Sequence, residues 1–443
     1  MKSNKILAIW TQALRAPWRD EGRPTAQQSR FFTNFFAMTK ANMLVLALPI
    51  LAMPLLTRLF TPEDFAVLAL FSAASAILLS VANFKCDWVL PNAASPSEAI
   101  ALSVAGVLAI LLSASLFAVL AGLQFLDFFG ENPISQLDWF VLLLPISVLV
   151  VALREMLSGW FVWTSELTLV GKATIAQGIS NVSLMIAFGL AGLAAFGLLS
   201  ALLVASVVGT LSLLCSALPN LKKSFSTFDR ESFAATIRRH SKSVASSTVV
   251  SLINVASLSL PVLLLASHYS MHEIGWYMLI HRLVGTPMGV LTSALGQSFW
   301  AQAADLVRKG EKTRLIVQFR RLTLLLLFAC APLSALCVLG SYLVGPVFGT
   351  EEWAGAGDVL VAMIPLFVGK LAFSSLNHLI VFEKKHLQIY GDVLRLALTF
   401  TAVWLAQYLE TGFIGAIFLI SLASLSGHLC LFAAHVHAHR RAI

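Results

Sequence analysis

Residues 273–302 form an apolar stretch with a cation inside it, EIGWYMLIHRLVGTPMGVLTSALGQSFWAQ. Read with a helical period, its polar and small residues fall near one stripe: Arg282, Gly285, Thr286, Gly289, Ser293, Gly296 and Gln297. The larger residues fall elsewhere: Leu279, Leu283, Val290 and Leu291. Arg282 lies roughly 12 Å along the helix axis, at about 1.5 Å per residue. An arginine at that depth of a membrane costs about 2.5–3.5 kcal/mol, unless it faces water or an anion, pairs with a buried carboxylate, or snorkels.

The composition places the chain in a membrane. Of its 443 residues, 58% are hydrophobic and only 12% are charged, whereas a soluble domain has about 25% charged residues. The net charge of +8 does not indicate nucleic acid, because the cations form short clusters between apolar runs, which is typical of a membrane protein. In this setting we expect Arg282 to face a water-filled, cation-lined path.

The cysteines and the N-terminus suggest no further chemistry. No cysteine pair has metal-ligand spacing, so we expect no metal and no cofactor. The basic N-terminal segment is followed by an apolar run long enough to span a bilayer, and by no cleavage site of a signal peptide. We therefore expect a retained first span.

Apolar stretches of 18 or more residues recur to the end of the chain and predict an all-α polytopic membrane protein with about twelve transmembrane helices. In the first half they lie near 36–58, 64–84, 98–122, 138–162, 170–191 and 194–217. In the second half they lie near 242–266, 273–301, 315–340, 356–382, 388–408 and 412–436.

The basic residues test this count and predict the orientation. With both termini and every even-numbered loop in the cytoplasm, Arg58 is the one Lys or Arg left for the outer side, besides Arg282, Lys370 and Arg395 inside helices. The outer loops carry acids instead: Asp127, Glu131, Asp138, Glu273, Glu351 and Glu352. An odd number of spans would mix basic and acidic loops on both sides of the membrane. The pattern therefore predicts an inner membrane protein with both termini cytoplasmic.

The basic segment 219–242 lies at the midpoint and predicts a connector between two six-helix bundles. The expected organisation is a cytoplasmic segment 1–35, a bundle 36–218, the connector 219–242, a bundle 243–437 and a cytoplasmic tail 438–443. Both halves would start on the same face, so a repeat would be related by an axis along the membrane normal. The start of the helix at Glu63-Asp64-Phe65-Ala66 is similar to that at Glu273-Ile274-Gly275, and chance similarity is the alternative.

Polar residues also occur in other predicted helices. Asn254 lies on a serine-rich stripe, Lys370 and Asn377 lie in the helix near 356–382, and Asp392 and Arg395 are neighbours three residues apart. Small polar residues on such stripes often serve only helix packing. Lys370 is therefore either a cavity cation or half of a buried ion pair, whereas Arg395 with Asp392, and Lys85 with Asp87, are expected as ion pairs.

Several enzyme classes are disfavoured by missing motifs. The chain has no Gly-x4-Gly-Lys-Ser/Thr phosphate loop, no HExxH and no GxSxG. Prolines inside the predicted helices, among them Pro261, Pro287 and Pro365, are candidate hinges of a transporter, or simple kinks of a static channel. Outer loops are too short to hold an acceptor for a membrane glycosyltransferase, so we expect movement of a substrate and no catalytic residues.

Three segments resemble one family. The run Pro54-Leu55-Leu56-Thr57-Arg58-Leu59-Phe60-Thr61-Pro62-Glu63-Asp64-Phe65 is similar to the first hairpin of bacterial polysaccharide biosynthesis flippases of the Wzx type, which carry O-antigen units. The helix from Gly275 through Arg282 and Pro287 to Phe299 resembles the eighth helix of that family. Phe348-Gly349 with Trp353, before the predicted tenth helix, also resembles the family. One departure is Ala66, where the family usually has glycine.

The resemblance implies the multidrug/oligosaccharidyl-lipid/polysaccharide exporter fold, with two six-helix bundles around a central cavity. It implies an undecaprenyl-pyrophosphate-linked oligosaccharide as substrate, moved from the cytoplasmic to the periplasmic leaflet for O-antigen, capsule or exopolysaccharide synthesis. The pyrophosphate would gain from cations in a low-dielectric cavity. The candidate cavity residues are Arg282, Lys370, Asn254, Asn377, Gln297 and Arg58, and the candidate ion-pair or gating residues are Asp392, Arg395, Lys85 and Asp87.

The hypothesis from the sequence is thus a flippase that works by alternating access, powered by an ion gradient or by substrate removal. Its expected partners are the lipid-linked substrate, the bilayer, a coupling ion, and a polysaccharide polymerase with its chain-length regulator, but no nucleic acid. The alternatives are a cation-coupled multidrug exporter of the same superfamily and, from another class, a membrane-embedded glycan polymerase or ligase.

Overall fold

The computed structural model describes residues 45–225, 230–308, 311–349, 351–374 and 385–441, all in helices and short connections. Its first helix is Val45–Leu59. The first half continues with α3 (Pro62–Ala82), α4 (Cys86–Val89), η1 (Leu90–Asn92), α5 (Pro96–Phe125), η2 (Ser135–Leu143), α6 (Leu144–Trp163), α7 (Leu167–Leu190) and α8 (Ala194–Phe225). The second half contains α9 (Arg230–Ala266), α10 (Met271–Ile280), η3 (His281–Gly285), α11 (Thr286–Arg308), α12 (Lys312–Phe348), α13 (Ala356–Ala362), α14 (Ile364–Gly369), η4 (Lys370–Ser374), α15 (Lys385–Tyr408) and α16 (Phe413–Arg441).

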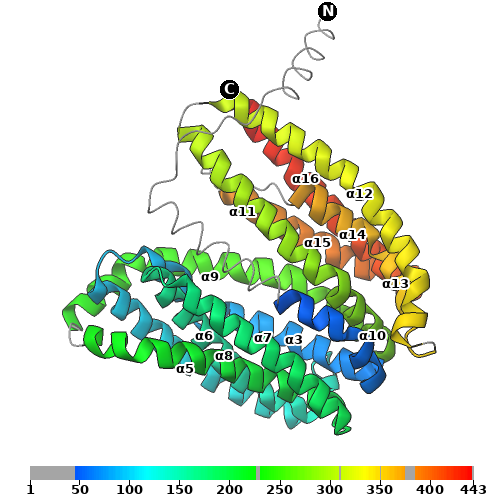
Figure 1. Ribbon diagram of the computed structural model, residues 1–443, viewed down its shortest axis with the longest axis horizontal. Helices are drawn as coiled ribbons and strands as arrows, with labels where there is room; N and C mark the ends of the chain where they lie inside the picture. The colour runs from blue at the N-terminus through cyan, green and yellow to red at the C-terminus, as the bar shows by residue number, and fades with distance from the viewer. Residues whose placement is uncertain (1–44, 226–229, 309–310, 350, 375–384, 442–443) are drawn as a thin grey trace, which may run out of the picture.

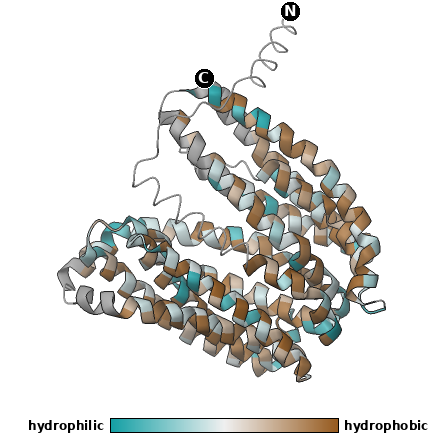
Figure 2. Ribbon diagram, viewed as in Figure 1, coloured by the Kyte–Doolittle hydropathy of each residue, from teal (hydrophilic) through white to brown (hydrophobic). Residues whose placement is uncertain are grey.

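Within these ranges, eight helices are long and apolar enough to cross a membrane, or nine if the pair α13 and α14–η4, bent by 42°, is one span. An all-helical polytopic membrane protein is therefore confirmed, whereas the predicted count of twelve is not. Figure 2 shows hydrophobic residues along the middle of the long helices and hydrophilic residues near their ends, as a bilayer requires.

Some predicted elements differ from the observed ones. Most of the predicted connector 219–242 is helical, since α8 runs to Phe225 and α9 begins at Arg230. The continuous helix predicted at 273–301 changes to a π-helix at His281–Gly285, and the one predicted at 356–382 is broken after Ala362. Hydrophobic periodicity detects the length of an apolar segment, but not a local change in its hydrogen-bond pattern.

Figure 1 shows two groups of helices that meet at one end and diverge toward the other. They meet near α10 and α13, which we call the closed end, and diverge toward the α8–α9 connection and the C-terminus, which we call the open end. One group contains α3 and α5 to α8, and the other contains α11 to α16. Helix α9 joins them, because it contacts α3 and α5 as well as α15.

The hydrophobic core follows this shape. Near the closed end one cluster of buried side chains combines both halves, with Phe65 and Leu68 of α3 beside Ile274 of α10 and Trp353 before α13. Toward the open end two clusters are separate: one belongs to the first half, around Trp160, and one to the second half, around Phe319. Among the described residues, buried side chains of both halves therefore form one cluster at the closed end, while toward the open end Val244 of α9 packs against the first-half cluster.

Candidate functional site

A cavity of about 1080 Å³ lies between the two halves. That volume is at the upper end of the range of about 300–1,000 Å³ for small-molecule sites. Its wall takes residues from helix Val45–Leu59, α3 and α7 of the first half, and from α9, α10, α11, α15 and α16 of the second half. Such a cavity can hold a sizeable polar group between the two halves.

Two cations in the wall lie in π-helical segments. Arg282 is the second residue of η3, and Lys370 is the first residue of η4. Short π-helical segments inside α-helices are rare and often mark functional sites. Both occur near prolines, Pro287 after η3 and Pro365 before η4, which remove backbone hydrogen bonds from their helices.

Arg282 is partly buried and lines the cavity. Among the residues that the structure describes, no carboxylate forms an ion pair with it. The stripe predicted from the sequence faces the cavity through Thr286, Ser293 and Gln297. Val290 and Leu291, which were predicted to lie elsewhere, line it as well. The cavity therefore extends further around α11 than a single stripe.

Arg395 also reaches the wall, but it has partners. Its Nη2 atom lies 3.2 Å from Asp392 Oδ1, as expected for neighbours three residues apart on α15. The same nitrogen donates to Ser257 Oγ and, at 3.4 Å, to Asn254 Oδ1 on α9. Asn254 therefore touches a cavity cation, although it does not line the cavity itself. This network links α9 to α15.

Two histidines in the wall were missed by the sequence analysis. His281 precedes Arg282, and its ring stacks on Tyr277 with 5.8 Å between centroids. His428 is 2% exposed on α16, and its Nδ1 donates to the carbonyl of Ser424 at 2.7 Å. The spacing of Ser421, Ser424 and His428, three and four residues, is a polar helical stripe that the sequence could have revealed.

No carboxylate lines the cavity within the described ranges. Three cations and two imidazoles line it instead, all from the second half. Such a wall favours an anion, because charge-assisted hydrogen bonds from guanidinium and ammonium groups are strong where the dielectric is low. A site for cationic drugs would need the opposite charge.

The remaining candidates lie elsewhere. Arg58 is exposed at the end of helix Val45–Leu59, outside the cavity wall, and Asn377 lies outside the described residues. The expected pair of Lys85 with Asp87 is replaced by other partners: Lys85 Nζ lies 3.1 Å from Glu155 Oε2, and Asn83 donates to Asp87 Oδ1 at 3.0 Å. Lys85 has a left-handed backbone (φ 50°) that begins α4, so its side chain turns toward α6.

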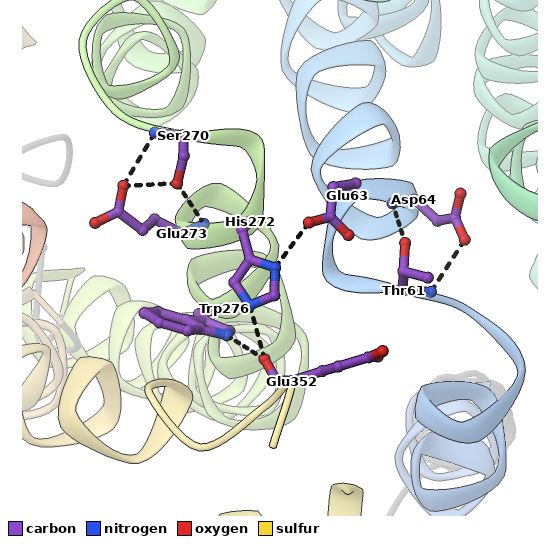
Figure 3. Close-up of polar contacts among 8 residues, drawn as sticks. All are labelled: Thr61, Glu63, Asp64, Ser270, His272, Glu273, Trp276 and Glu352. Carbon is purple, nitrogen blue, oxygen red and sulfur yellow. Dashed lines mark hydrogen bonds and ion pairs between the residues drawn. The ribbon is translucent and has the colours of Figure 1, made fainter. Parts of the chain in front are cut away.

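At the closed end a polar contact joins the two halves, and two more lie within the second half (Figure 3). His272 on α10 contacts Glu63 Oε1 of α3 through Nδ1 at 2.7 Å, and the carbonyl of Glu352 through Nε2 at 3.0 Å. Trp276 Nε1 donates to the same carbonyl at 2.7 Å. We call His272, Glu63 and the Glu352 carbonyl the latch.

Close packing supports the latch. A Cβ atom on Gly275 would lie 2.0 Å from the carbonyl oxygen of Pro62, so only glycine allows α10 to approach α3 this closely. The Trp353 indole is 1% exposed, donates to the Thr57 carbonyl at 3.1 Å, and meets Phe65 edge-on at 5.3 Å. The closed end therefore combines a buried core with a polar rim.

Solved structures with this fold are known. The chain is similar to a lipid II flippase, MurJ, in an inward closed conformation, with a TM-score of 0.71 and 12% identity over 91% of this chain and 89% of that one. It is similar to a multidrug resistance MATE family transporter of the MOP superfamily, inward-facing, with a TM-score of 0.63 and 14% identity over 91% and 96%. A MOP superfamily transporter from Pyrococcus furiosus gives a TM-score of 0.56 and 13% identity over 93% and 95%. The sequence has no match among curated proteins.

The fold defines the class of protein: a multi-pass membrane protein with the fold seen in MOP superfamily transporters. The model of a protein family described as "Polysaccharide biosynthesis protein" matches residues 55–357, well over half of the chain. The chain belongs to this polysaccharide biosynthesis family, as the resemblance in its first hairpin and eighth helix predicted. It is therefore a multi-pass membrane protein of a polysaccharide biosynthesis family.

Proposed function

We propose that this protein is a transporter, a flippase for lipid-linked oligosaccharides with a pyrophosphate head, which it moves from the cytoplasmic to the periplasmic leaflet. The observation that carries the proposal is the charge of the cavity wall. As far as the chain is described, this wall contains Arg282 and Lys370 and no carboxylate. A pyrophosphate carries the complementary charge, and serines of α9 and α16 can serve sugar hydroxyls. The MurJ likeness and the family membership support a substrate of this class.

The same proposal includes twelve spans in two bundles, 36–218 and 243–437. To the eight spans and the bent pair we add helix Val45–Leu59, α10 with η3 and α11, and α15. We place both termini and the open end in the cytoplasm of an inner membrane, because the basic residues gather there and Glu273, Glu351 and Glu352 lie at the closed end. The described conformation would then receive substrate from the cytoplasmic side, and alternating access would open the other end.

The test is Arg282→Ala in a strain that lacks its own copy of the gene. A charge-assisted hydrogen bond is worth about 1.5–3 kcal/mol, so we expect surface glycan export to fall by about 10- to 100-fold while lipid-linked glycan accumulates on the inner leaflet. Arg320→Ala is the matched control, because Arg320 is an exposed arginine on α12 outside the cavity wall. Unchanged export in the Arg282 variant, with normal amounts of protein in the membrane, would refute the cavity role.

A further inference from the structure

The hydrogen bonds of His272 determine how many protons the latch holds. Its Nε2 faces the carbonyl oxygen of Glu352, which only accepts hydrogen bonds, so Nε2 carries a hydrogen. Its Nδ1 faces a carboxylate oxygen of Glu63 at 2.7 Å. An ionised carboxylate also only accepts, so either Nδ1 carries a second hydrogen or the carboxyl group of Glu63 is protonated. In both cases the pair holds one proton more than a neutral imidazole beside an ionised carboxylate.

The other charged groups at this end do not replace that proton. Asp64 and Glu273 accept from the backbone at the starts of α3 and α10, where each completes a capping box with Thr61 or Ser270. The nearby acids Glu351 and Glu352 have exposed side chains, and Arg58 is also exposed. These surroundings are rich in acid and favour a protonated latch.

Separation of the two halves at this end breaks the latch. The side chains of His272 and Glu63 are already 35% and 51% exposed, so protons can exchange with water on that side. An imidazole without such partners changes its charge between about pH 5 and 8. As the pH rises through that range, the separated pair loses the extra proton, and opening therefore releases one.

We infer that the closed end binds one proton shared by His272 and Glu63, and that opening this end releases it to the same side. The inference rests on the proposed alternating access. Its sign follows from linkage: the closed form binds more protons, so low pH stabilises it and rising pH favours opening. Release of one proton changes the ratio of open to closed molecules by at most about tenfold for each pH unit. The pH outside the membrane thereby sets how readily the transporter opens to that side.

The test measures a distance across the closed end of the full chain in lipid nanodiscs. Spin labels are attached at Glu131→Cys and Leu409→Cys, two exposed positions in loops of different halves, after the native cysteines are replaced. Both loops lie at this end, since Gln136 bonds to Ala266 and Tyr269 bonds to Thr411. We expect the population with the longer distance to grow several-fold between pH 6 and pH 8.

Two variants test the shared proton. In Glu63→Gln the amide can donate to Nδ1 of a neutral His272, so we expect the closed distance at both pH values. His268→Gln is the matched control: His268 lies at the same end but bonds to Ser267 and Gln407, so the pH dependence should remain.

Three results would each overturn the inference: distances in the parent protein that do not change with pH, an unchanged pH dependence in Glu63→Gln, or its loss in His268→Gln. The readout is a distance and needs no substrate. Failure of the latch is therefore distinguishable from failure of the proposed function, which appears in glycan export.

Discussion

Helices α3 and α10 begin alike and then differ. Each starts with a capping box, Thr61 with Asp64 in α3 and Ser270 with Glu273 in α10. Each residue of the second box follows its counterpart in the first by 209 positions. Glu63 and His272 are related by the same 209 positions: each is the second residue of its helix, and they meet across the closed end. The repeat suggested by the sequence thus has a structural counterpart at these two helix starts.

The difference begins one turn further on. Helix α3 continues as a regular helix to Ala82, whereas α10 ends at Ile280 and passes into the π-helix that carries Arg282. At the separation of 209 residues, Ala73 is the counterpart of Arg282, and both line the cavity. Equivalent helix starts therefore meet at the closed end, while in the described part of the chain only the second half supplies cations to the cavity wall.

The difference between the halves would have no functional meaning if a cation served equally well in either half. Moving it, in the double variant Ala73→Arg with Arg282→Ala, should leave surface glycan export reduced by about 10- to 100-fold, as in Arg282→Ala alone. The reason is that an anion must meet several donors at once, and Lys370 and His428 remain in the second half. Surface glycan measured per amount of membrane-inserted protein checks this, and export restored to the parent level would contradict it.

A second pair of variants examines the contact between the two helices. Gly275→Ala places a Cβ atom against the Pro62 carbonyl, so we expect the closed end to be destabilised by about 1–3 kcal/mol. Its counterpart Ala66→Gly removes one buried methyl group from α3 and should cost about 1 kcal/mol. Thermal unfolding in detergent measures the loss of stability, and the label distance shows whether the closed end separates.

No loss of stability in Gly275→Ala, with an unchanged label distance, would contradict the close approach at Gly275. Ala66 is also where the family usually has glycine. The first half therefore accepts a methyl group at the position where the second half does not.

The smallest effects are expected at the capping boxes. Thr61→Ala and Ser270→Ala each remove a side chain that accepts from the third residue of its helix, at a cost of about 0.5–2 kcal/mol. Because the two caps are alike, we expect similar losses of stability, and additive ones in the double variant. Calorimetry of the purified protein checks this, and losses that differ by more than about 1 kcal/mol would show that the caps are not equivalent.

Much of the fold could be predicted from the sequence, because the length of the apolar segments and the basic residues between them indicate where membrane helices lie. The all-helical membrane class, a helix start within two residues of Glu273 and the cation in the cavity follow from residues such as Glu273 and Arg282. Sequence periodicity has no signal for a π-helix, so the breaks at His281–Gly285 and after Ala362 were missed. Nor does it show partners distant in sequence, so Lys85 was assigned to Asp87 instead of Glu155.

The latch was also beyond sequence reasoning. Glu63 and His272 each look like an ordinary polar residue at a helix start, and their contact depends on how the two halves pack. By contrast, the capping boxes are local and visible in the sequence, since Thr61 precedes Asp64 by three residues as Ser270 precedes Glu273.

The latch depends on the two halves being different in sequence at equivalent positions. A two-fold axis between like helices brings equivalent positions face to face, as in a symmetric dimer, where a residue on the axis meets its own copy. In a dimer of one unduplicated half, the second helix position would have met either another glutamate or another histidine. A complementary acid and base can meet there only once the two copies are encoded separately. Because the two halves of this chain differ at these positions, an acid and a base meet here instead.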